Sequence, residues 1–269
     1  MRYLNILAAV ILIAVAADAQ TVRLVQAETG ATDLEISVGD VIDVDIVIDF
    51  EGSAVSGAVV FLSMDDAFLV ADNGRTGESG TQPFIPGPLF ESEPITNLFL
   101  PESDPVAAQL SGFQLDFGTI LSESDAPPNS SGVLASIRLL AVKPAADALL
   151  LIDDNPIRET RLVLSDGVSE ARYRTTQGME ITVTGIELRD IPDVILTPGQ
   201  SDSVQIGSLN DYVLNTLASV DDITWSFEPA EPESLSIEIR PESNRVVIIP
   251  VEGWRGLQRI KWTATEPPR

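Results

Sequence analysis

The chain has 269 residues, no cysteine, no histidine and a formal net charge of −25 at pH 7. The absence of histidine excludes a Ser-His-Asp triad, histidine acid–base chemistry and the commonest zinc ligand, and the absence of cysteine excludes disulfide support. Such acidity argues against nucleic acid and anionic membranes as partners, and suits a soluble acidic surface, a basic partner or calcium.

The first 19 residues have the form of an export signal. Arg2 provides a positive start, an apolar run follows from Ile6 to Ala17, and Ala17-Asp18-Ala19 fits a small-x-small cleavage site. The apolar run is shorter than the roughly 20 residues that a membrane-spanning helix needs, although an uncleaved anchor is the alternative. We expect a secreted or cell-surface protein that begins at Gln20 and is not inserted in the membrane after cleavage.

The strongest local pattern lies between Leu34 and Phe50. From Ile42 on, every even position is apolar, and three odd positions are the aspartates Asp43, Asp45 and Asp49. Because side chains alternate across a strand, this pattern predicts a β-strand with one buried face and one face toward water.

Further strands are predicted at short intervals with turn signals between them and almost no helical period. Gly57 inside one of them indicates a bulge or a close approach of two backbones. The pattern is typical of an all-β sandwich or barrel. The expected strands are Thr21 to Gln26, Val55 to Leu62, Ala67 to Ala71, Gly112 to Leu121, Val133 to Val142, Ala148 to Ile152, Arg161 to Leu164 and Met179 to Thr184.

From Asp72 to Gly112 the alternation is lost. Six prolines and five glycines fall in this stretch, around short apolar islands at Phe84-Ile85 and Asn97 to Leu100. A loop this long inside a compact domain is usually functional or disordered. We expect a lid, a partner-binding loop or a loosely packed insertion, and a variable insertion without a specific role is the alternative.

A second all-β unit is predicted after a linker at Ile186 to Pro192. About 80 residues with six or seven short strands match the size of a small Ig-like sandwich. The expected organisation is therefore a signal peptide at 1–19, a first β-sandwich at 20–185 and a smaller one at 186–269. The candidate strands of the second unit are Asp193 to Leu196, Ser203 to Ile206, Ile223 to Phe227, Leu235 to Ile239, Val246 to Ile249 and Arg259 to Thr265.

Four stretches of the first unit resemble, in order, the motifs of cohesins, the modules with which scaffolding proteins dock enzymes. The likeness covers nearly all of residues 22–185. It departs at Ser63-Met64-Asp65, where many cohesins have an aromatic residue before the aspartate, and in the insertion at 72–112. The four stretches are Val38-Gly39-Asp40, Val55-Ser56-Gly57-Ala58 with Asp65-Asp66, Phe113 to Ile120, and Ser131 to Ile137.

This resemblance implies a jelly-roll β-sandwich, related in fold to carbohydrate-binding modules, that binds a partner through one sheet face. The implied partner is a dockerin, a small calcium-loaded helical domain, in a scaffold or cell-surface assembly of the kind that serves polysaccharide breakdown. The implied protein is a binding module and not an enzyme. The insertion leaves the specificity for the partner open.

The second unit resembles the tandem Ig/cadherin-like repeats of bacterial surface proteins. In that family a D-x-D calcium signature usually follows a Tyr-Val pair, whereas here Val213 is followed by Leu214-Asn215-Thr216-Leu217 and the aspartates come only at Asp221-Asp222. The stretches that carry the resemblance are Pro192-Asp193-Val194, Thr197 to Ser201, Asp211-Tyr212-Val213, Ile223 to Ser226, Gly253 to Gly256 and Trp262 to Thr265.

No motif fixes a catalytic, cofactor-binding or metal residue, and we assign none. Asp72-Asn73-Gly74 and Asp153-Asp154-Asn155 are conceivable calcium loops, but turn chemistry explains them equally well. Carbohydrate binding usually needs a row of exposed aromatic rings, and Trp225, Trp254 and Trp262 occur at positions that favour core packing.

The sequence therefore predicts a non-catalytic module that docks a protein. A carbohydrate-binding or adhesion module is the first alternative. A glycoside hydrolase with paired carboxylates is the second, since carboxyl groups about 5–10 Å apart are what that reaction needs.

Overall fold

The computed structural model describes residues 20–50, 54–77, 80–100, 104–105, 107–121, 126–128, 130–195, 204–228 and 234–267. The expected signal peptide at 1–19 lies outside these ranges, as does Thr197 to Ser201. Within them the secondary structure is β-strand apart from three short 3-10 turns: η1 (Ala107–Gln109), η2 (Leu209–Tyr212) and η3 (Val220–Asp222). No helix in the described ranges is both long enough and apolar enough to cross a bilayer.

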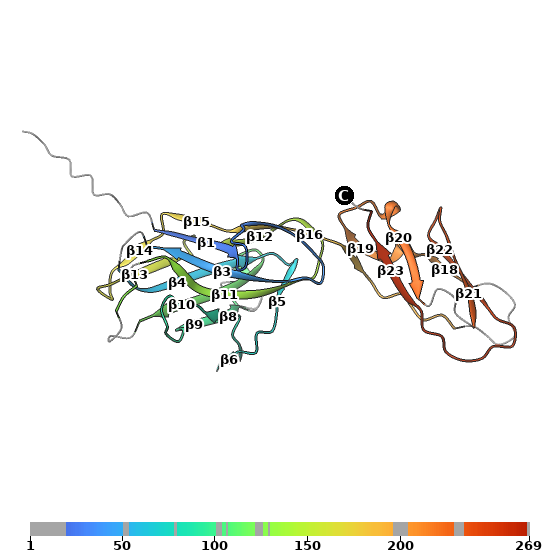
Figure 1. Ribbon diagram of the computed structural model, residues 1–269, viewed down its shortest axis with the longest axis horizontal. Helices are drawn as coiled ribbons and strands as arrows, with labels where there is room; N and C mark the ends of the chain where they lie inside the picture. Colours follow the sequence, from blue (N-terminus) through green and yellow to red (C-terminus); the bar gives the residue numbers. More distant parts are fainter. Residues whose placement is uncertain are drawn as a thin grey trace, which may run out of the picture.

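The first sheet has six strands in the order β15-β1-β3-β11-β5, with β8 pairing the same edge of β11 as β5. Figure 1 shows these strands together with those of the second sheet as one group. The six strands are β1 (Thr21–Gln26), β3 (Val41–Asp49), β5 (Phe68–Val70), β8 (Phe84–Pro86), β11 (Gly132–Ala141) and β15 (Thr175–Gln177).

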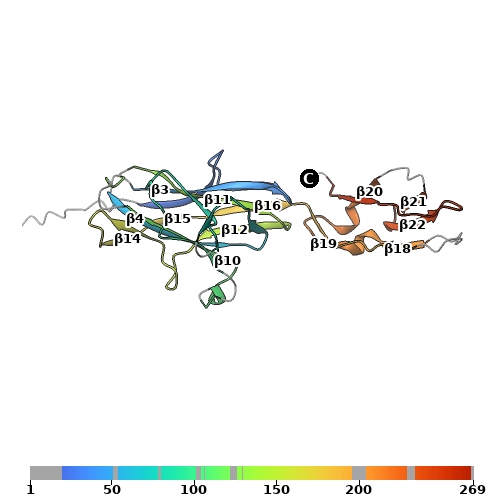
Figure 2. The same cartoon turned by 90° about the horizontal axis from the view of Figure 1, so that it is seen from below.

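The second sheet has eight strands in the order β14-β13-β4-β12-β16-β2, and β10 and then β9 extend it from the other edge of β4. Seen from below, β3 and β11 lie in one layer and β10 and β12 in the other (Figure 2). The eight strands are β2 (Asp33–Ser37), β4 (Val55–Met64), β9 (Thr96–Leu100), β10 (Phe113–Ile120), β12 (Ala145–Ile152), β13 (Arg161–Leu164), β14 (Glu170–Arg172) and β16 (Met179–Thr184).

The core between the two sheets follows from the alternation of the strands. In β3, Ile42, Val44, Ile46 and Ile48 are buried, while the intervening side chains are half-exposed. These residues join one cluster with alternate residues of β4, β10 and β11, including Phe84 and Phe117, whose rings meet edge to face at 5.4 Å. Burial of such a face is the main source of stability in a chain without disulfides.

The chain crosses from the first sheet to the second between β1 and β2 and again, near the end of this unit, between β15 and β16. β1 pairs β15 and β2 pairs β16, both in parallel, so that the last strands lie beside the first. The second crossing occurs at Gly178, where a Cβ atom would lie 2.5 Å from the carbonyl oxygen of Leu150. A side chain at this position would clash with backbone, so the crossing requires glycine.

The all-β class and the sandwich are confirmed, and every predicted strand of residues 20–185 is present with small shifts at its ends. The stretch from Leu34 to Phe50 is divided into β2 and β3 by a turn at Gly39, whose φ is +95°. The close approach expected at Gly57 is also confirmed, because a Cβ there would lie 2.8 Å from the carbonyl oxygen of Thr119.

The expectation of an irregular stretch from Asp72 to Gly112 is wrong in part. Its two apolar islands are the strands β8 and β9, and a short hairpin of β6 (Thr76–Gly77) and β7 (Gly80–Thr81) precedes them. Asn97 connects β8 and β9, because its side chain donates to the carbonyl of Phe84 at 2.8 Å and accepts from the amide of Phe84 at 3.0 Å. The side-chain amide of Asn97 thus satisfies both backbone polar groups of Phe84 and joins a strand of one sheet to a strand of the other.

The second group of strands forms three small sheets, β17-β19, β18-β22-β21 and β20-β23. The linker expected at Ile186 to Pro192 instead begins with a strand, and the strand expected at Asp193 to Leu196 is not formed over 193–195, while Leu196 lies outside the described ranges. The strands are β17 (Ile186–Leu188), β18 (Val204–Ser208), β19 (Val213–Thr216), β20 (Thr224–Glu228), β21 (Leu235–Arg240), β22 (Arg245–Pro250) and β23 (Lys261–Thr265).

These strands surround a separate and smaller core. Its buried members are Leu209, Leu235, Val246 and Ile248, and the three tryptophans pack against it while half-buried. Trp225 also donates from Nε1 to Oδ1 of Asn210 at 3.0 Å. The predicted packing role of the tryptophans is confirmed, whereas the Ig-like assignment stays a prediction.

Candidate docking face

The outer surface of the eight-stranded sheet carries several apolar side chains on neighbouring strands. In β4, Val60 and Leu62 enter the core, so Val59 and Phe61 lie on the opposite side. Across the pairing, Val59 lies beside Gly118 of β10 and Arg161 of β13. The apolar character continues into Val163, Ile120 and Leu151 on neighbouring strands. We call this surface the outer face.

A loop crosses the outer face between β12 and β13. These residues, 153–160, are referred to below as the strap. The amide of Asp153 donates to the carbonyl of Phe61 at 2.8 Å, and the amide of Phe61 donates to Oγ1 of Thr160 at 3.1 Å. Both ends of the strap are therefore bonded to the same residue of β4.

Arg158 fixes the middle of the strap. Its guanidinium donates to Oδ2 of Asp153 at 3.0 Å and to the carbonyls of Leu115 at 2.7 Å and Leu62 at 3.3 Å. It also contacts the side chains of Gln114 and Asp116. The side chain is only 3% exposed and its Cζ lies 5.0 Å from the centre of the Phe61 ring. A single cation thus joins the strap to both β4 and β10.

The two carboxylates beside Arg158 share one countercharge in a poorly hydrated place. Burial raises the pKa of the Asp116 carboxyl above its ordinary value, and the guanidinium of Arg158 opposes that rise. Asp153 is held from its other oxygen by the hydroxyl of Ser63 at 2.6 Å. Such a network is costly to leave half-satisfied, so the strap is expected to be rigid where Arg158 holds it.

The strap turns at Asn155, whose Oδ1 accepts the amides of Ile157 at 2.9 Å and Arg158 at 3.0 Å. This turn presents Pro156 and Ile157 at the tip, and the Ile157 side chain is 47% exposed. An exposed isoleucine on a firmly held turn provides a preformed apolar contact. The conformational entropy of the turn is already lost on folding, so binding does not have to order it again.

A groove of about 330 Å³ lies between the strap and strands β4 and β13. Its apolar lining comes from Val59, Phe61 and Val163 on the sheet and from Pro156 and Ile157 on the strap. The charged side chains at one end of the groove neutralise one another, because Arg161 pairs with both Glu159 and Glu170 and Arg172 pairs with Glu159 at 2.5 Å. The groove can take an apolar side chain, with polar partners available at one end.

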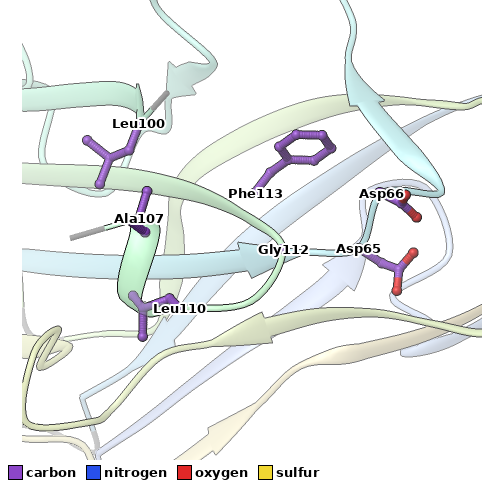
Figure 3. A pocket seen from close by; sticks show the side chains of 8 residues that line it. Asp65, Asp66, Leu100, Ala107, Leu110, Gly112 and Phe113 are labelled. Carbon is purple, nitrogen blue, oxygen red and sulfur yellow. The ribbon is translucent and has the colours of Figure 1, made fainter. Parts of the chain in front are cut away.

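A larger cavity of about 490 Å³ lies where β4 ends, between the η1 turn and the loop before β5. Figure 3 shows Leu100 and Leu110 on one side, the carboxylates of Asp65 and Asp66 on the other, and Phe113 between them. The hydrolase alternative needs two carboxyl groups at one cavity, and Asp65 and Asp66 are the candidates for that pair here.

Both of these carboxylates are already engaged. Asp65 accepts the amide of Ala67 at 2.9 Å and so caps its own turn, and Asp66 forms an ion pair with Lys143 at 2.6 Å. In glycoside hydrolysis one of the two carboxyl groups must carry a proton at working pH. Because Asp65 already caps a turn and Asp66 is already paired with Lys143, this geometry offers no support for the acid role.

The two conceivable calcium loops also use their side chains internally. Oδ1 of Asp72 accepts the amide of Gly74 at 2.8 Å, and Oδ1 of Asn73 accepts that of Arg75 at 2.9 Å. In the other loop Asp153 is paired with Arg158. Turn chemistry accounts for both segments, and over the described ranges no cluster of three or more His, Cys, Asp or Glu residues is arranged for a metal ion.

Sequence reasoning assigned no site residue and therefore missed the groove. A usable signal was present, because Val59 and Phe61 stand at the solvent-facing positions of a strand whose other positions already fill the core. A strand that is apolar on both faces indicates that the second face is covered by something. Nothing in the sequence around Arg158 distinguishes it from a surface arginine.

Comparison with known proteins gives a likeness in architecture at low identity. No protein-family model matches the chain, and no curated protein matches it. Solved structures that are similar include a non-cellulosomal cohesin from Archaeoglobus fulgidus, with 17% identity over 62% of this chain and 91% of that one and a TM-score of 0.39. The third cohesin ScaC of Acetivibrio cellulolyticus, solved in complex with the ScaB dockerin, shows 14% identity over 61% and 98% of the two chains and a TM-score of 0.42. CaCohA2 from Clostridium acetobutylicum shows 17% identity over 61% and 92%, with a TM-score of 0.40.

Proposed function

We propose that this protein is an exported, non-catalytic docking module, secreted or held at the cell surface, whose partner protein binds the outer face of the eight-stranded sheet. We further propose that residues 20–185 form the docking domain and residues 186–269 a second domain. The observation that carries the proposal is the apolar groove between the sheet and the strap, since it combines a rigid apolar wall with an apolar floor.

The form of the groove favours a folded protein as the partner. A patch of exposed apolar side chains that is rimmed by charged pairs is typical of protein-binding surfaces. The groove would receive one anchor side chain, while Ile120 and Leu151 extend the contact on either side. The ordered set of motifs that resembles cohesins points to a calcium-loaded dockerin as that partner, and the calcium would belong to the partner.

Carbohydrate binding is the weaker candidate. Among the exposed large apolar residues of the described chain, Phe99 is the one aromatic residue, and its ring packs against Phe113 with 5.6 Å between centroids. A single tilted ring does not form the flat row on which sugar rings stack.

The test uses the mature chain, residues 20–269, immobilised and exposed to a panel of recombinant dockerins, each with calcium and with EDTA. We expect calcium-dependent retention of at least one dockerin and loss of that retention when Ile157→Asp and Val163→Asp are combined. The control is Leu69→Asp, which adds one negative charge on β5 of the other sheet, where Leu69 is 48% exposed.

Two results would refute the proposal in distinguishable ways. If Leu69→Asp abolishes retention of the dockerin and the groove variant preserves it, the docking surface lies on the other sheet. Failure to retain any dockerin, together with binding to insoluble polysaccharide, would replace protein docking with carbohydrate binding.

A further inference from the structure

The stretch from Asp72 to Gly112 builds most of the cavity at the end of β4. The volume of this cavity, about 490 Å³, is within the range of about 300–1,000 Å³ that is usual for ligand sites. It is separate from the groove beside the strap, since the two share no lining residue. Five of its eight lining residues come from this stretch: Leu100, Ala107, Ala108, Leu110 and Gly112.

Two opposite walls of the cavity differ in chemistry. Leu100 and Leu110 lie on one side, the carboxylates of Asp65 and Asp66 lie on the other, and the ring of Phe113 stands between them (Figure 3). An occupant that crosses the cavity therefore meets apolar atoms along its length and carboxylate oxygens at its end. A purely apolar group would desolvate the acidic wall without a partner, and a small ion would leave the apolar wall to water.

The acidic wall holds more negative charge than its neighbours balance. Asp66 pairs with Lys143 at 2.6 Å, whereas among the described residues Asp65 forms no ion pair and only its Oδ1 accepts a hydrogen bond. The hydrogen bond to Asp66, and then the charge of Asp66, raise the pKa of Lys143, and Glu187 and Asp65 add smaller contributions. One ammonium therefore serves three carboxylates, so charge complementarity favours a further cation at this wall.

The cavity opens beside the outer face. Leu100 is the partner of Gln114 in the pairing of β9 with β10, and Gln114 is in turn the partner of Ser63 in β4. Residues directly opposite each other in an antiparallel sheet lie on the same face, and so do residues two apart on one strand. Leu100 therefore shares the outer face with Ser63 and Phe61. A protein that covers the outer face lies next to the cavity and can place a side chain in it.

We propose that the cavity receives an arginine or lysine side chain of the protein that docks on the outer face. This inference rests on the docking function proposed above and adds the chemistry of the partner. The aliphatic stem packs on the apolar wall and the cationic head reaches the Asp65 carboxylate, because long basic side chains combine an apolar stem with a charged end. Since the insertion builds the apolar wall, it selects partners that carry a basic residue at this place.

The first test uses two small probes that have nearly the same shape and differ in charge. n-Butylguanidinium carries the head group and part of the stem of an arginine, and n-butylurea is its neutral isostere. Each is titrated into isotope-labelled residues 20–269 and followed by NMR of the backbone amides. We expect saturable shifts over residues 107–113 with butylguanidinium, and roughly fivefold weaker binding or less with butylurea.

Variants at the acidic wall test which groups bind the cation. Asp65→Asn with Asp66→Asn removes both charges, while the asparagine at 65 keeps an oxygen that can accept the amide of Ala67. We expect roughly fivefold weaker binding of butylguanidinium. The matched control is Asp33→Asn with Glu35→Gln on β2, which removes two exposed carboxylates at the opposite edge of the same sheet. The control should bind both probes as the parent does.

A variant of the apolar wall gives an independent test without a change of charge. Leu110→Ser removes part of the contact for the stem, and we expect it to weaken the binding of both probes. Unchanged circular dichroism of each variant establishes that it is folded.

The second test measures what the cavity contributes to docking. For a dockerin that is retained in the panel described above, we expect Asp65→Asn with Asp66→Asn to raise the dissociation constant roughly fivefold and to reduce its dependence on salt. The control pair on β2 should leave both quantities unchanged.

The inference is overturned if butylguanidinium shows no saturable binding, if butylurea binds equally well, or if the control pair weakens binding as much as the variant of the acidic wall. It is also overturned if a retained dockerin binds that variant as tightly as the parent, because the cavity would then lie outside the interface. Retention of no dockerin refutes the docking function and the docked occupant with it, whereas the probe titration decides by itself whether the cavity binds a cation.

Discussion

Replacing Arg158 with methionine tests whether the strap is fixed by a buried cation. The change keeps much of the side-chain volume and removes the hydrogen bonds to Asp153, Leu115 and Leu62 and the contacts to Gln114 and Asp116. It leaves Asp116 and Asp153 without a countercharge where their side chains are 17% and 11% exposed.

The expected loss follows from the cost of an uncompensated buried charge. Removing one partner of a buried ion pair typically costs about 3–5 kcal/mol, and loss of the contact over the Phe61 ring adds about 0.5–1 kcal/mol. The strap is a surface loop that can admit water after the change, so we expect the low end, about 3 kcal/mol. That is a large share of the roughly 5–15 kcal/mol by which domains are stable.

The assay is urea unfolding of residues 20–269, followed in parallel by far-ultraviolet circular dichroism and by tryptophan fluorescence. All three tryptophans lie after residue 186, at Trp225, Trp254 and Trp262. Their fluorescence therefore reports on the second unit and serves as an internal control. We expect the transition of the first sandwich to shift to lower urea and the tryptophan transition to stay in place.

Two companion variants separate charge from packing. Arg158→Lys keeps the cation but lacks the planar fork, so it should lose less than the methionine variant. Adding Asp116→Asn and Asp153→Asn to Arg158→Met should recover part of the loss, because the uncompensated carboxylates are then gone. A loss below about 1 kcal/mol for Arg158→Met, or no recovery in the triple variant, would refute this account of the network.

Three smaller changes test other parts of the first sandwich. Tyr173→Phe should stabilise by about 1 kcal/mol in thermal unfolding, because the Tyr173 hydroxyl is buried without a hydrogen-bond partner in the described chain; a clear loss would contradict this reading. Gly57→Ala should cost about 1–3 kcal/mol in urea unfolding, since its Cβ would lie 2.8 Å from the carbonyl of Thr119, and an unchanged midpoint would show that the strands can move apart. The hydrogen bond from Arg138 lowers the pKa of Asp43, so the stability from this pair is present above about pH 4 and is lost as the pH falls through the lowered pKa. Arg138→Gln should remove that part of the pH dependence, which is measured as unfolding midpoints between about pH 5 and about pH 2.

The strands of the first unit could be predicted because their signal is local. In β3 the alternation of isoleucine and valine with aspartate fixes both the strand and the face that it buries. Gly57 likewise predicts a close approach of two backbones, because a glycine inside a strand pattern can be read directly from the sequence. These predictions need no knowledge of the partner strand.

The errors occurred where pairing depends on distant residues. β8 and β9 are short and flanked by prolines, and they are strands only because β11 and β10 offer edges to them. β17 and β19 pair with each other across more than twenty residues, so neither has a local signal strong enough to separate it from a linker.

The apolar outer positions of β4 signal a covered face, but the groove beside the strap could not be located from the sequence, for the same reason. Its floor comes from β4 and β13 and its wall from the strap, which are brought together by the pairing of Val59 with Arg161 and by Arg158. The partners that hold Arg158 include Asp116, which lies more than forty residues away in the sequence, and backbone carbonyls of β4 and β10.

A buried ion pair is weak evidence for stability, because well-packed apolar residues often stabilise a fold equally well. The Arg158 network fixes the position of the strap. Its hydrogen bonds run to two backbone carbonyls and to three side chains, so it holds the strap in one place over β4 and β10. Ile157 at the tip then forms a wall of the groove in the free protein, so the partner proposed above would not have to order it. The consequence is that Arg158→Met should weaken docking although Arg158 does not line the groove, and it should do so even in the triple variant that recovers stability.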